Sequence, residues 1–146
     1  MEKINNKEWV LILTIFSIIM LGHFVTSAKP SLVDSVYDEL VKRNVKHVDI
    51  VIKQCIKETG WFKCKVCSWK QHANPFGFRH KSKISKSNPK GYFTFTTWQD
   101  AVEFYEGWQK RKYKGGDYYK FLSDVGYATD PDYVKDLKLI VYERSR

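Results

Sequence analysis

Glu58 is the residue whose position in the sequence best suits acid–base chemistry. It stands in the stretch IKETGW at residues 56–61, at the end of a helix that we expect to run from about Lys46 to Glu58. At about 100° per residue, Glu58 lies about 20° from Val51, on the flank of the apolar stripe. Burial there and the negative helix end both disfavour the ionised carboxyl and would raise its pKa, which suits a general acid. The alternative interpretation is a structural carboxylate that bonds to nearby backbone or pairs with a lysine such as Lys63.

Four more helices are expected around this one. Two helix starts carry cap signals, Ser31 with Asp34 and Thr97 with Asp100, and apolar residues follow each at helical spacing. Glycine, asparagine and proline mark the other boundaries. The expected helices begin after Ser31, near Lys46, after Thr97, at Tyr118 and at Asp130–Pro131, and the first four end near Asn44, Glu58, Lys114 and Val125.

Two short strands are expected between the second and third helices. NPFGF at 74–78 is a turn leading into a strand, and GYFTF at 91–95 follows the turn signal Asn88–Gly91. The segment 61–71 has no clear period and is expected to be irregular. The sequence therefore predicts an α+β domain, mostly α, of about five helices with a small β-hairpin beside a cleft.

The first 28 residues are typical of a leader segment. A polar start with two lysines precedes an apolar run from Trp9 to Val25, and small residues follow at 25–28. We expect residues 1–28 to be a signal peptide or, if uncleaved, an N-terminal membrane anchor, and residues 29–146 to be the functional domain. The protein would then be exported to the periplasm, cell envelope or extracellular space, touching a membrane only through that segment.

The charge of the chain is concentrated in one block. The net charge is +9, and no Asp or Glu occurs between Thr59 and Gln99. Eight cations lie in that interval: Lys63, Lys65, Lys70, Arg79, Lys81, Lys83, Lys86 and Lys90. Such a block is either a solvated loop or a surface that faces a polyanion. For an exported protein, an acidic envelope polymer is a better partner than nucleic acid.

Cys55, Cys64 and Cys67 are the cysteines of the chain and are candidates for disulfide formation. In an oxidising compartment, one disulfide and one free thiol is the simplest count. Cys55 could pair with either of the others, and a bridge between Cys64 and Cys67 is possible but tight. A zinc site with His72 matches no standard ligand spacing, so we expect no metal.

Three stretches in series resemble a known family. ETGWF at 58–62, NPFGF at 74–78 and GYATDPDYVKDL at 126–137 are similar to motifs of the glucosaminidase family of peptidoglycan hydrolases, whose domain is of the mannosyl-glycoprotein endo-beta-N-acetylglucosaminidase type. The resemblance covers about residues 46–140, and the order and spacing of the motifs also match. It implies a lysozyme-like fold and hydrolysis of the β-1,4 bond between N-acetylglucosamine and N-acetylmuramic acid, with no metal or organic cofactor.

The resemblance also implies roles for particular residues. Glu58 matches the catalytic acid, and Tyr127 matches a cleft tyrosine that orients substrate or stabilises the reacting ring. Asn74 and Phe76 lie in the turn that shapes the cleft floor, where Asn74 either contacts sugar or serves only the turn. Beside these, Trp61 and Trp69 are candidates for stacking on sugar faces, although core packing would explain them equally well.

One part of the family pattern is missing. Glycoside hydrolysis usually employs two carboxyl groups, and some members carry the second one in the hairpin region, where this chain has none. Three routes stay open: Glu103 or Asp130 acts as base, Tyr127 and backbone groups position water, or the 2-acetamido group of the substrate assists. We favour substrate assistance slightly, since the bond cleaved follows an N-acetylated sugar and substrate assistance is a known exception to the two-carboxylate rule. A helix cap explains Asp130.

Two classes of function follow. The first is a monomeric exported hydrolase whose partner is the glycan strand of peptidoglycan. The second is a wall-binding module that has weak or no catalytic activity because the second acid is missing.

Overall fold

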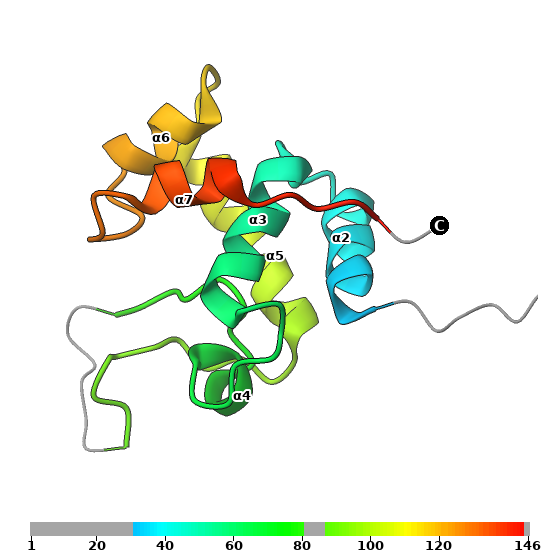
Figure 1. Ribbon diagram of the computed structural model, residues 1–146, viewed down its shortest axis with the longest axis vertical. Helices are drawn as coiled ribbons and strands as arrows, with labels where there is room; N and C mark the ends of the chain where they lie inside the picture. The colour runs from blue at the N-terminus through cyan, green and yellow to red at the C-terminus, as the bar shows by residue number, and fades with distance from the viewer. Residues whose placement is uncertain (1–30, 81–86, 145–146) are drawn as a thin grey trace, which may run out of the picture.

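The protein is described by a computed structural model that covers residues 31–80 and 87–144. The expected leader at 1–28 and three lysines of the basic block, Lys81, Lys83 and Lys86, lie outside the described residues. The described part is mostly helical, as expected (Figure 1). Its helices are α2 (Leu32–Lys42), α3 (Val48–Thr59), α4 (Ser68–His72), α5 (Trp98–Lys112), α6 (Tyr118–Asp124) and α7 (Tyr133–Leu139).

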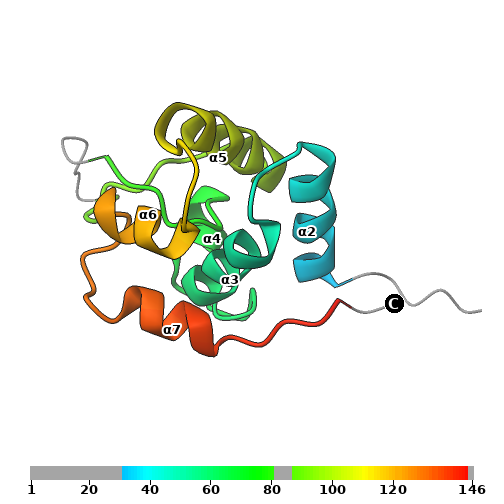
Figure 2. The same cartoon turned by 90° about the horizontal axis from the view of Figure 1, so that it is seen from above.

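Helix α3 is the centre of the core. It packs against α2, α4 and α7, while α5 packs against α2 and α6 against α7. Figure 2, viewed from above, shows α3 enclosed between α5 on one side and α7 on the other. Val51, Ile52 and Cys55 of α3 are completely buried, and Ile56 almost so. The apolar stripe read from the sequence therefore faces the interior and fixes the direction in which the end of α3 points.

Local cap signals set the helix boundaries. The Ser31 hydroxyl accepts the Asp34 N–H at 3.1 Å, and Thr97 and Asp100 form a reciprocal capping box at the start of α5. Asn44 (φ 54°) and Gly60 (φ 54°) take the left-handed conformation after α2 and α3. The expected starts of α2 and α5 are confirmed by these bonds.

The expected β-hairpin is not present as two strands. In the described residues a single antiparallel bridge joins Arg79 to Tyr92. The ladder stops there because the Asn74 side chain bonds the two groups that would pair next: it accepts the Phe78 N–H at 3.2 Å and donates to the Phe93 carbonyl oxygen at 3.1 Å. The Phe95 N–H donates to the carbonyl of His72 instead of to the opposite segment. Segments 74–80 and 87–95 therefore form an extended arm (Figure 1), which is held by the backbone bonds of this one bridge and by the Asn74 side chain.

Two helix expectations also need correction. Segment 61–71 is not wholly irregular, since α4 lies within 68–72. The last helix begins at Tyr133 and not at Pro131, because the Asp130 carboxylate accepts the Asp132 N–H at 3.0 Å and holds residues 130–132 in a turn. Among the helices of the described ranges, none has both the length and the apolar character to cross a bilayer.

The C-terminal segment returns to the first described helix. After α7 the chain runs in extended form beside α2, as Figures 1 and 2 both show. The Tyr142 hydroxyl donates to the Asp34 carboxylate at 2.6 Å, and Arg144 pairs with Asp38 at 2.8 Å. The ends of the described chain are therefore fastened to the same helix.

Candidate active site

Glu58 lies in the last turn of α3, partly buried against the core. Burial raises the pKa of its carboxyl group above the ordinary value of 4.5. Three neighbours act in the opposite direction: the Tyr133 hydroxyl, the Arg79 guanidinium and the Lys57 ammonium each favour the ionised form. The net shift is upward, so the direction predicted from the helix pattern is confirmed, and the carboxyl holds its proton to a higher pH than a free one does.

Gly77 forms the wall against which the Glu58 carboxyl rests. A Cβ atom built on Gly77 would lie 2.5 Å from Oε2 of Glu58, closer than any real contact, and the backbone there has a φ of +68°. Only glycine satisfies both the left-handed conformation and this approach. The Asn-Pro-Phe-Gly turn therefore packs its backbone directly onto the carboxyl group.

Asn74 and Phe76 support that turn from the interior. Asn74 is completely buried, and its amide bonds three backbone groups of the extended arm: Phe78 N–H and the carbonyls of Phe78 and Phe93. Phe76 is 1% exposed and packs on Tyr105 with ring centroids 4.6 Å apart. In this conformation both side chains position the turn, and the expectation that they contact sugar stays a prediction.

Tyr127 joins the C-terminal part of the domain to the same turn. Its hydroxyl donates to the Phe76 carbonyl at 2.7 Å, and its ring packs on Tyr133 with centroids 5.7 Å apart. Burial, followed by the charges of Tyr133 and Glu58, raises the pKa of the Tyr127 hydroxyl well above 10, so it keeps its proton. Tyr127 and Glu58, 69 positions apart in the sequence, thus border the same turn.

Two polar groups beside Glu58 were missed by sequence reasoning. Tyr133 is 5% exposed and Gln54 is completely buried, yet the Tyr133 hydroxyl and the Gln54 Nε2 make no hydrogen bond of standard geometry with the described residues. Gln54 lies one turn before Glu58 on α3. The Tyr133 hydroxyl is close enough to Glu58 to lower the pKa of its carboxyl, and Gln54 is close enough to Tyr133 to lower the pKa of that hydroxyl. Tyr133 is the last residue of the Tyr-Ala-x-Asp-Pro-x-Tyr motif, and its place in that motif is the one feature of the sequence that could have indicated a role at the site.

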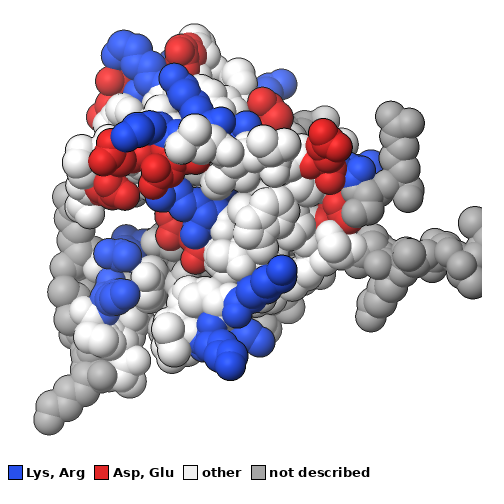
Figure 3. All heavy atoms as spheres, viewed as in Figure 1, with Lys and Arg blue, Asp and Glu red and all other residues white. Residues whose placement is uncertain are grey.

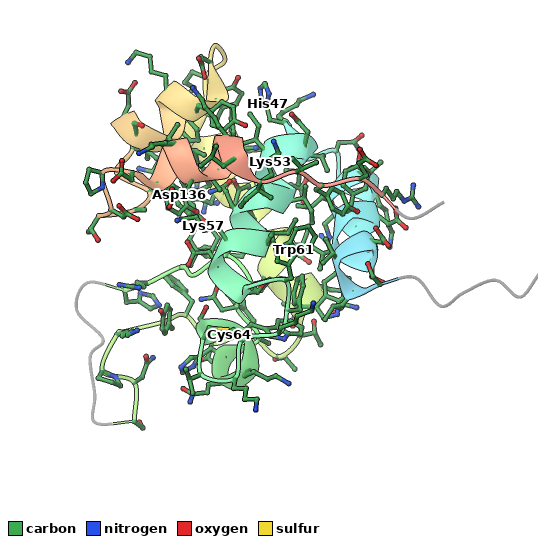
Figure 4. The ribbon with its side chains drawn as sticks, viewed as in Figure 1. His47, Lys53, Lys57, Trp61, Cys64 and Asp136 are labelled. Atoms are coloured by element: carbon green, nitrogen blue, oxygen red, sulfur yellow. The ribbon has the colours of Figure 1, made fainter. Side chains whose placement is uncertain are left out.

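Two cations flank the carboxyl. Lys57 points toward Asp136 on α7, as Figure 4 shows, with its ammonium 2.5 Å from the Asp136 carboxylate and 4.0 Å from that of Asp130. Arg79, on the extended arm, lies over the Tyr92 ring at 4.9 Å and donates to its hydroxyl at 3.2 Å. Among the described residues, no carboxylate lies within ion-pair distance of Arg79.

The two candidates for a second acid lie in different surroundings. Glu103, on α5, pairs at 3.2 Å with Arg43, the residue that follows α2. Asp130 is linked to the neighbourhood of Glu58 through Lys57. Asp130 is therefore the better placed of the two, although its other oxygen accepts the Asp132 N–H as a turn residue does.

The two candidate stacking residues, Trp61 and Trp69, lie on either side of the loop that follows α3. Trp61 is 45% exposed and, like Phe62, takes the left-handed conformation, with φ values of 59° and 60°. Trp69 is half-buried and meets the Phe62 ring edge to face at 4.9 Å. Trp61 therefore offers a free aromatic face near the end of α3, whereas Trp69 is part of a small packed pair.

The cavities overlap only in part with the candidate active site around Glu58. A cavity of about 380 Å³ is lined by His47, Gln109 and Tyr113, among others, at the other end of α3, about 16 Å along the helix from Glu58. A smaller one of about 170 Å³, lined by Asp130, Tyr133 and Leu122 among others, adjoins the site through Tyr133. The described residues contain no group of three or more His, Cys, Asp or Glu side chains arranged to hold a metal ion.

Comparison with protein families identifies the chain. The family model for glucosaminidase, described as mannosyl-glycoprotein endo-beta-N-acetylglucosaminidase, matches residues 33–145. The protein therefore belongs to the glucosaminidase family, which is a family of glycoside hydrolases. The resemblance inferred from the three motifs is confirmed. No curated protein and no solved structure compared with the chain gives a match.

Proposed function

We propose that this protein hydrolyses the β-1,4 bond between N-acetylglucosamine and N-acetylmuramic acid in peptidoglycan, with Glu58 as general acid. The observation that carries the proposal is the placement of Glu58 at the end of α3, partly buried and against Gly77, with an upward-shifted pKa. A neutral carboxyl so placed can donate its proton to the glycosidic oxygen as the C1–O bond breaks. Membership of a glycoside hydrolase family supports this assignment.

The 2-acetamido group of the substrate is proposed to take the place of the second carboxyl group. Residues 59–99 include no Asp or Glu, and the Glu103 carboxylate forms an ion pair with Arg43. In the proposed route, the carbonyl oxygen of the 2-acetamido group attacks C1 as the leaving oxygen takes the proton of Glu58. Water then opens the cyclic intermediate, and the Glu58 carboxylate takes a proton from that water, which restores the acid. Asp130 as a base, and water positioned by Tyr127, are the alternative routes.

The proposed partner is the glycan strand of peptidoglycan, and the proposed location is outside the cytoplasm. Lysines near the site would hold glycan strands that carry lactyl and peptide carboxylates, and the N-terminal segment would direct export to the cell envelope or beyond. Within this proposal the protein acts as a monomer without a cofactor.

The Glu58→Gln variant tests the role of the carboxyl. Glutamine keeps the size of the side chain but has no acidic proton, so clearing of purified peptidoglycan should fall by about 10² to 10⁴-fold. Binding to the wall in a pelleting assay should persist. The matched control is Glu143→Gln, which neutralises an exposed carboxyl and should leave clearing unchanged. Clearing by Glu58→Gln at the parental rate would refute the assignment.

Product analysis tests the bond. Mass spectrometry of the reduced fragments should find N-acetylglucosamine at the new reducing ends. Ends on N-acetylmuramic acid would instead make the protein a muramidase.

The missing second acid favours one other candidate, a wall-binding module. A parent protein that pellets with peptidoglycan but releases no reducing ends over prolonged digestion would support that function and reject hydrolysis.

A further inference from the structure

Cys64 and Cys67 form a pair on the loop between α3 and α4. They are separated by two residues, and Cys67 is the residue that precedes α4. The Cys67 thiol lies 3.8 Å from the Cys64 carbonyl oxygen, and the Cys64 N–H is held by the Thr59 carbonyl at 3.1 Å. Both thiols are free and partly exposed, whereas the Cys55 thiol is buried in the core. Figure 4 shows Cys64 beside α4, below the end of α3.

The surroundings of the pair are positively charged. Lys63 and Lys65 flank Cys64 in the sequence, Lys90 approaches it from the extended arm, and no acid occurs between 59 and 99. A thiolate is favoured by neighbouring cations and by donors directed at the sulfur. This environment differs from that of Cys55, where burial and the charge of Glu58 raise the thiol pKa.

The two thiols are chemically unequal. The neighbouring Cys67 thiol lowers the pKa of the Cys64 thiol, helped by backbone N–H groups and by Lys90. Partial burial, followed by the neighbouring Cys64 side chain, raises the pKa of the Cys67 thiol. One exposed nucleophilic thiol beside a less acidic partner is the arrangement that thiol–disulfide exchange requires.

We infer that Cys64 and Cys67 are a redox-active dithiol site that exchanges with small disulfides such as oxidised glutathione. The Cys64 thiolate attacks one sulfur of the disulfide, whose S–S bond breaks and releases one glutathione thiolate. The Cys67 thiol then loses its proton to solvent and attacks the Cys64 sulfur, releasing the second glutathione. The two cysteines are oxidised by two electrons, and one disulfide is reduced to two thiols.

The position of the pair gives the exchange a structural effect. The preceding residues Trp61 and Phe62 are held in the left-handed conformation, and Trp69 follows two residues after Cys67. A bond between Cys64 and Cys67 would therefore close the middle of the loop that carries both candidate stacking tryptophans. The dithiol chemistry does not depend on the proposed function, so it can fail or succeed separately.

The test uses the reduced full chain incubated with oxidised glutathione, then alkylated and digested with trypsin. Trypsin cuts after Lys63, Lys65 and Lys70, so the bond would join peptides 64–65 and 66–70, with a mass two hydrogens lower than their sum. Cys55 should be alkylated only after unfolding, which also reports that the chain was folded. Absence of the linked pair in folded protein, or dimers joined through Cys64 in its place, would overturn the inference.

Single variants test the order of attack. In Cys67→Ser, glutathione should remain bound to Cys64, because the resolving thiol is missing. In Cys64→Ser, glutathione should add to Cys67 several-fold more slowly, because that thiol is less acidic and more buried. Equal rates, or faster addition at Cys67, would contradict the assignment of Cys64 as the nucleophile. Circular dichroism of both variants checks that the fold is kept.

Discussion

The proton of Glu58 is controlled by a small number of side chains from distant parts of the chain. Burial raises the pKa of the carboxyl, while Tyr133, Arg79 and Lys57 lower it. A general acid must be protonated to act, so activity should fall as the pH rises through this pKa. Each neighbour that favours the ionised form therefore limits activity on the alkaline side.

Tyr133→Phe tests this balance. The hydroxyl favours the ionised form of Glu58, so its removal should raise the pKa of Glu58 further and move the alkaline limb of the rate profile to higher pH. The measurement is the initial rate of peptidoglycan clearing against pH. Tyr119→Phe, which removes a hydroxyl from a half-exposed tyrosine on α6, should leave the limb in place. A Tyr133→Phe profile that is lowered but not displaced would indicate a packing role only.

Glu58→Gln should also change stability with pH. Between the ordinary carboxyl pKa of 4.5 and the raised folded value, the native state binds more protons than the unfolded state. The free energy of unfolding of the parent therefore decreases as the pH rises through that interval. The neutral variant escapes this loss, so it should melt at a higher temperature than the parent near pH 8. Thermal unfolding over a pH series measures the difference, which should vanish below about pH 4.5. A difference in melting temperature that does not change with pH would contradict the raised pKa of Glu58 in the folded state.

At the scale of elements, the turn at 74–77 holds the end of α3. Gly77→Ala adds a methyl group at 2.5 Å from the Glu58 carboxyl, in a backbone of φ +68°. The left-handed conformation should destabilise the domain by about 1 to 2 kcal/mol. Displacement of the carboxyl should lower activity further, by a factor on the order of 100. Urea unfolding and peptidoglycan clearing measure the two effects separately.

Gly126→Ala is the matched control for that prediction. Gly126 has nearly the same backbone, with φ +62°, but a Cβ atom there would meet nothing within 4 Å. It should lose a similar amount of stability and retain most of the activity. If both variants lose activity equally, contact with Glu58 is not the cause.

Elements with local signals could be predicted from the sequence, and those that depend on distant contacts could not. The caps at Ser31 and Thr97 each involve residues three positions apart, so the starts of α2 and α5 could be predicted from the sequence. The prediction of two strands was wrong because the Asn74 side chain bonds the Phe78 N–H and the Phe93 carbonyl oxygen, which would otherwise pair with each other, and no periodicity reveals this. Helix α4 has five residues, too few for an apolar period.

The same distinction applies to the site. The inward position of Glu58 follows from its place on one helix and was predicted. Tyr133 and Arg79 reach Glu58 through tertiary packing from 75 and 21 residues further along the chain. A single sequence gives no distance between such residues, so only the family motif pointed to the region of Tyr133.

At the scale of the whole molecule, the charges are divided between two regions. In Figure 3 the part of the face over α4 and the extended arm shows Lys and Arg with no Asp or Glu, whereas acidic and basic groups alternate around α6 and α7. The described cations of the basic block are Lys63, Lys65, Lys70, Arg79 and Lys90. Such a one-sided field attracts an anionic polymer and is screened by salt.

Binding to peptidoglycan should therefore weaken as ionic strength rises. Lys70→Glu should lower binding and reduce its dependence on salt, as measured by pelleting across a series of sodium chloride concentrations. Lys114→Glu changes the net charge equally but lies in the loop after α5, outside the basic block, and should have a smaller effect. Equal effects of the two variants would show that net charge, and not its position, controls binding.

The attachment of the C-terminal segment to α2 has a consequence for engineering. Tyr142 and Arg144 are bonded to Asp34 and Asp38, so the two ends of the described chain meet on one helix. A short linker from 144 to 31 could join them, and new termini could be opened at Gly115–Gly116, where the backbone is exposed and added Cβ atoms meet nothing. The domain is thus suited to circular permutation, and to insertion as a cassette into a surface loop of another protein.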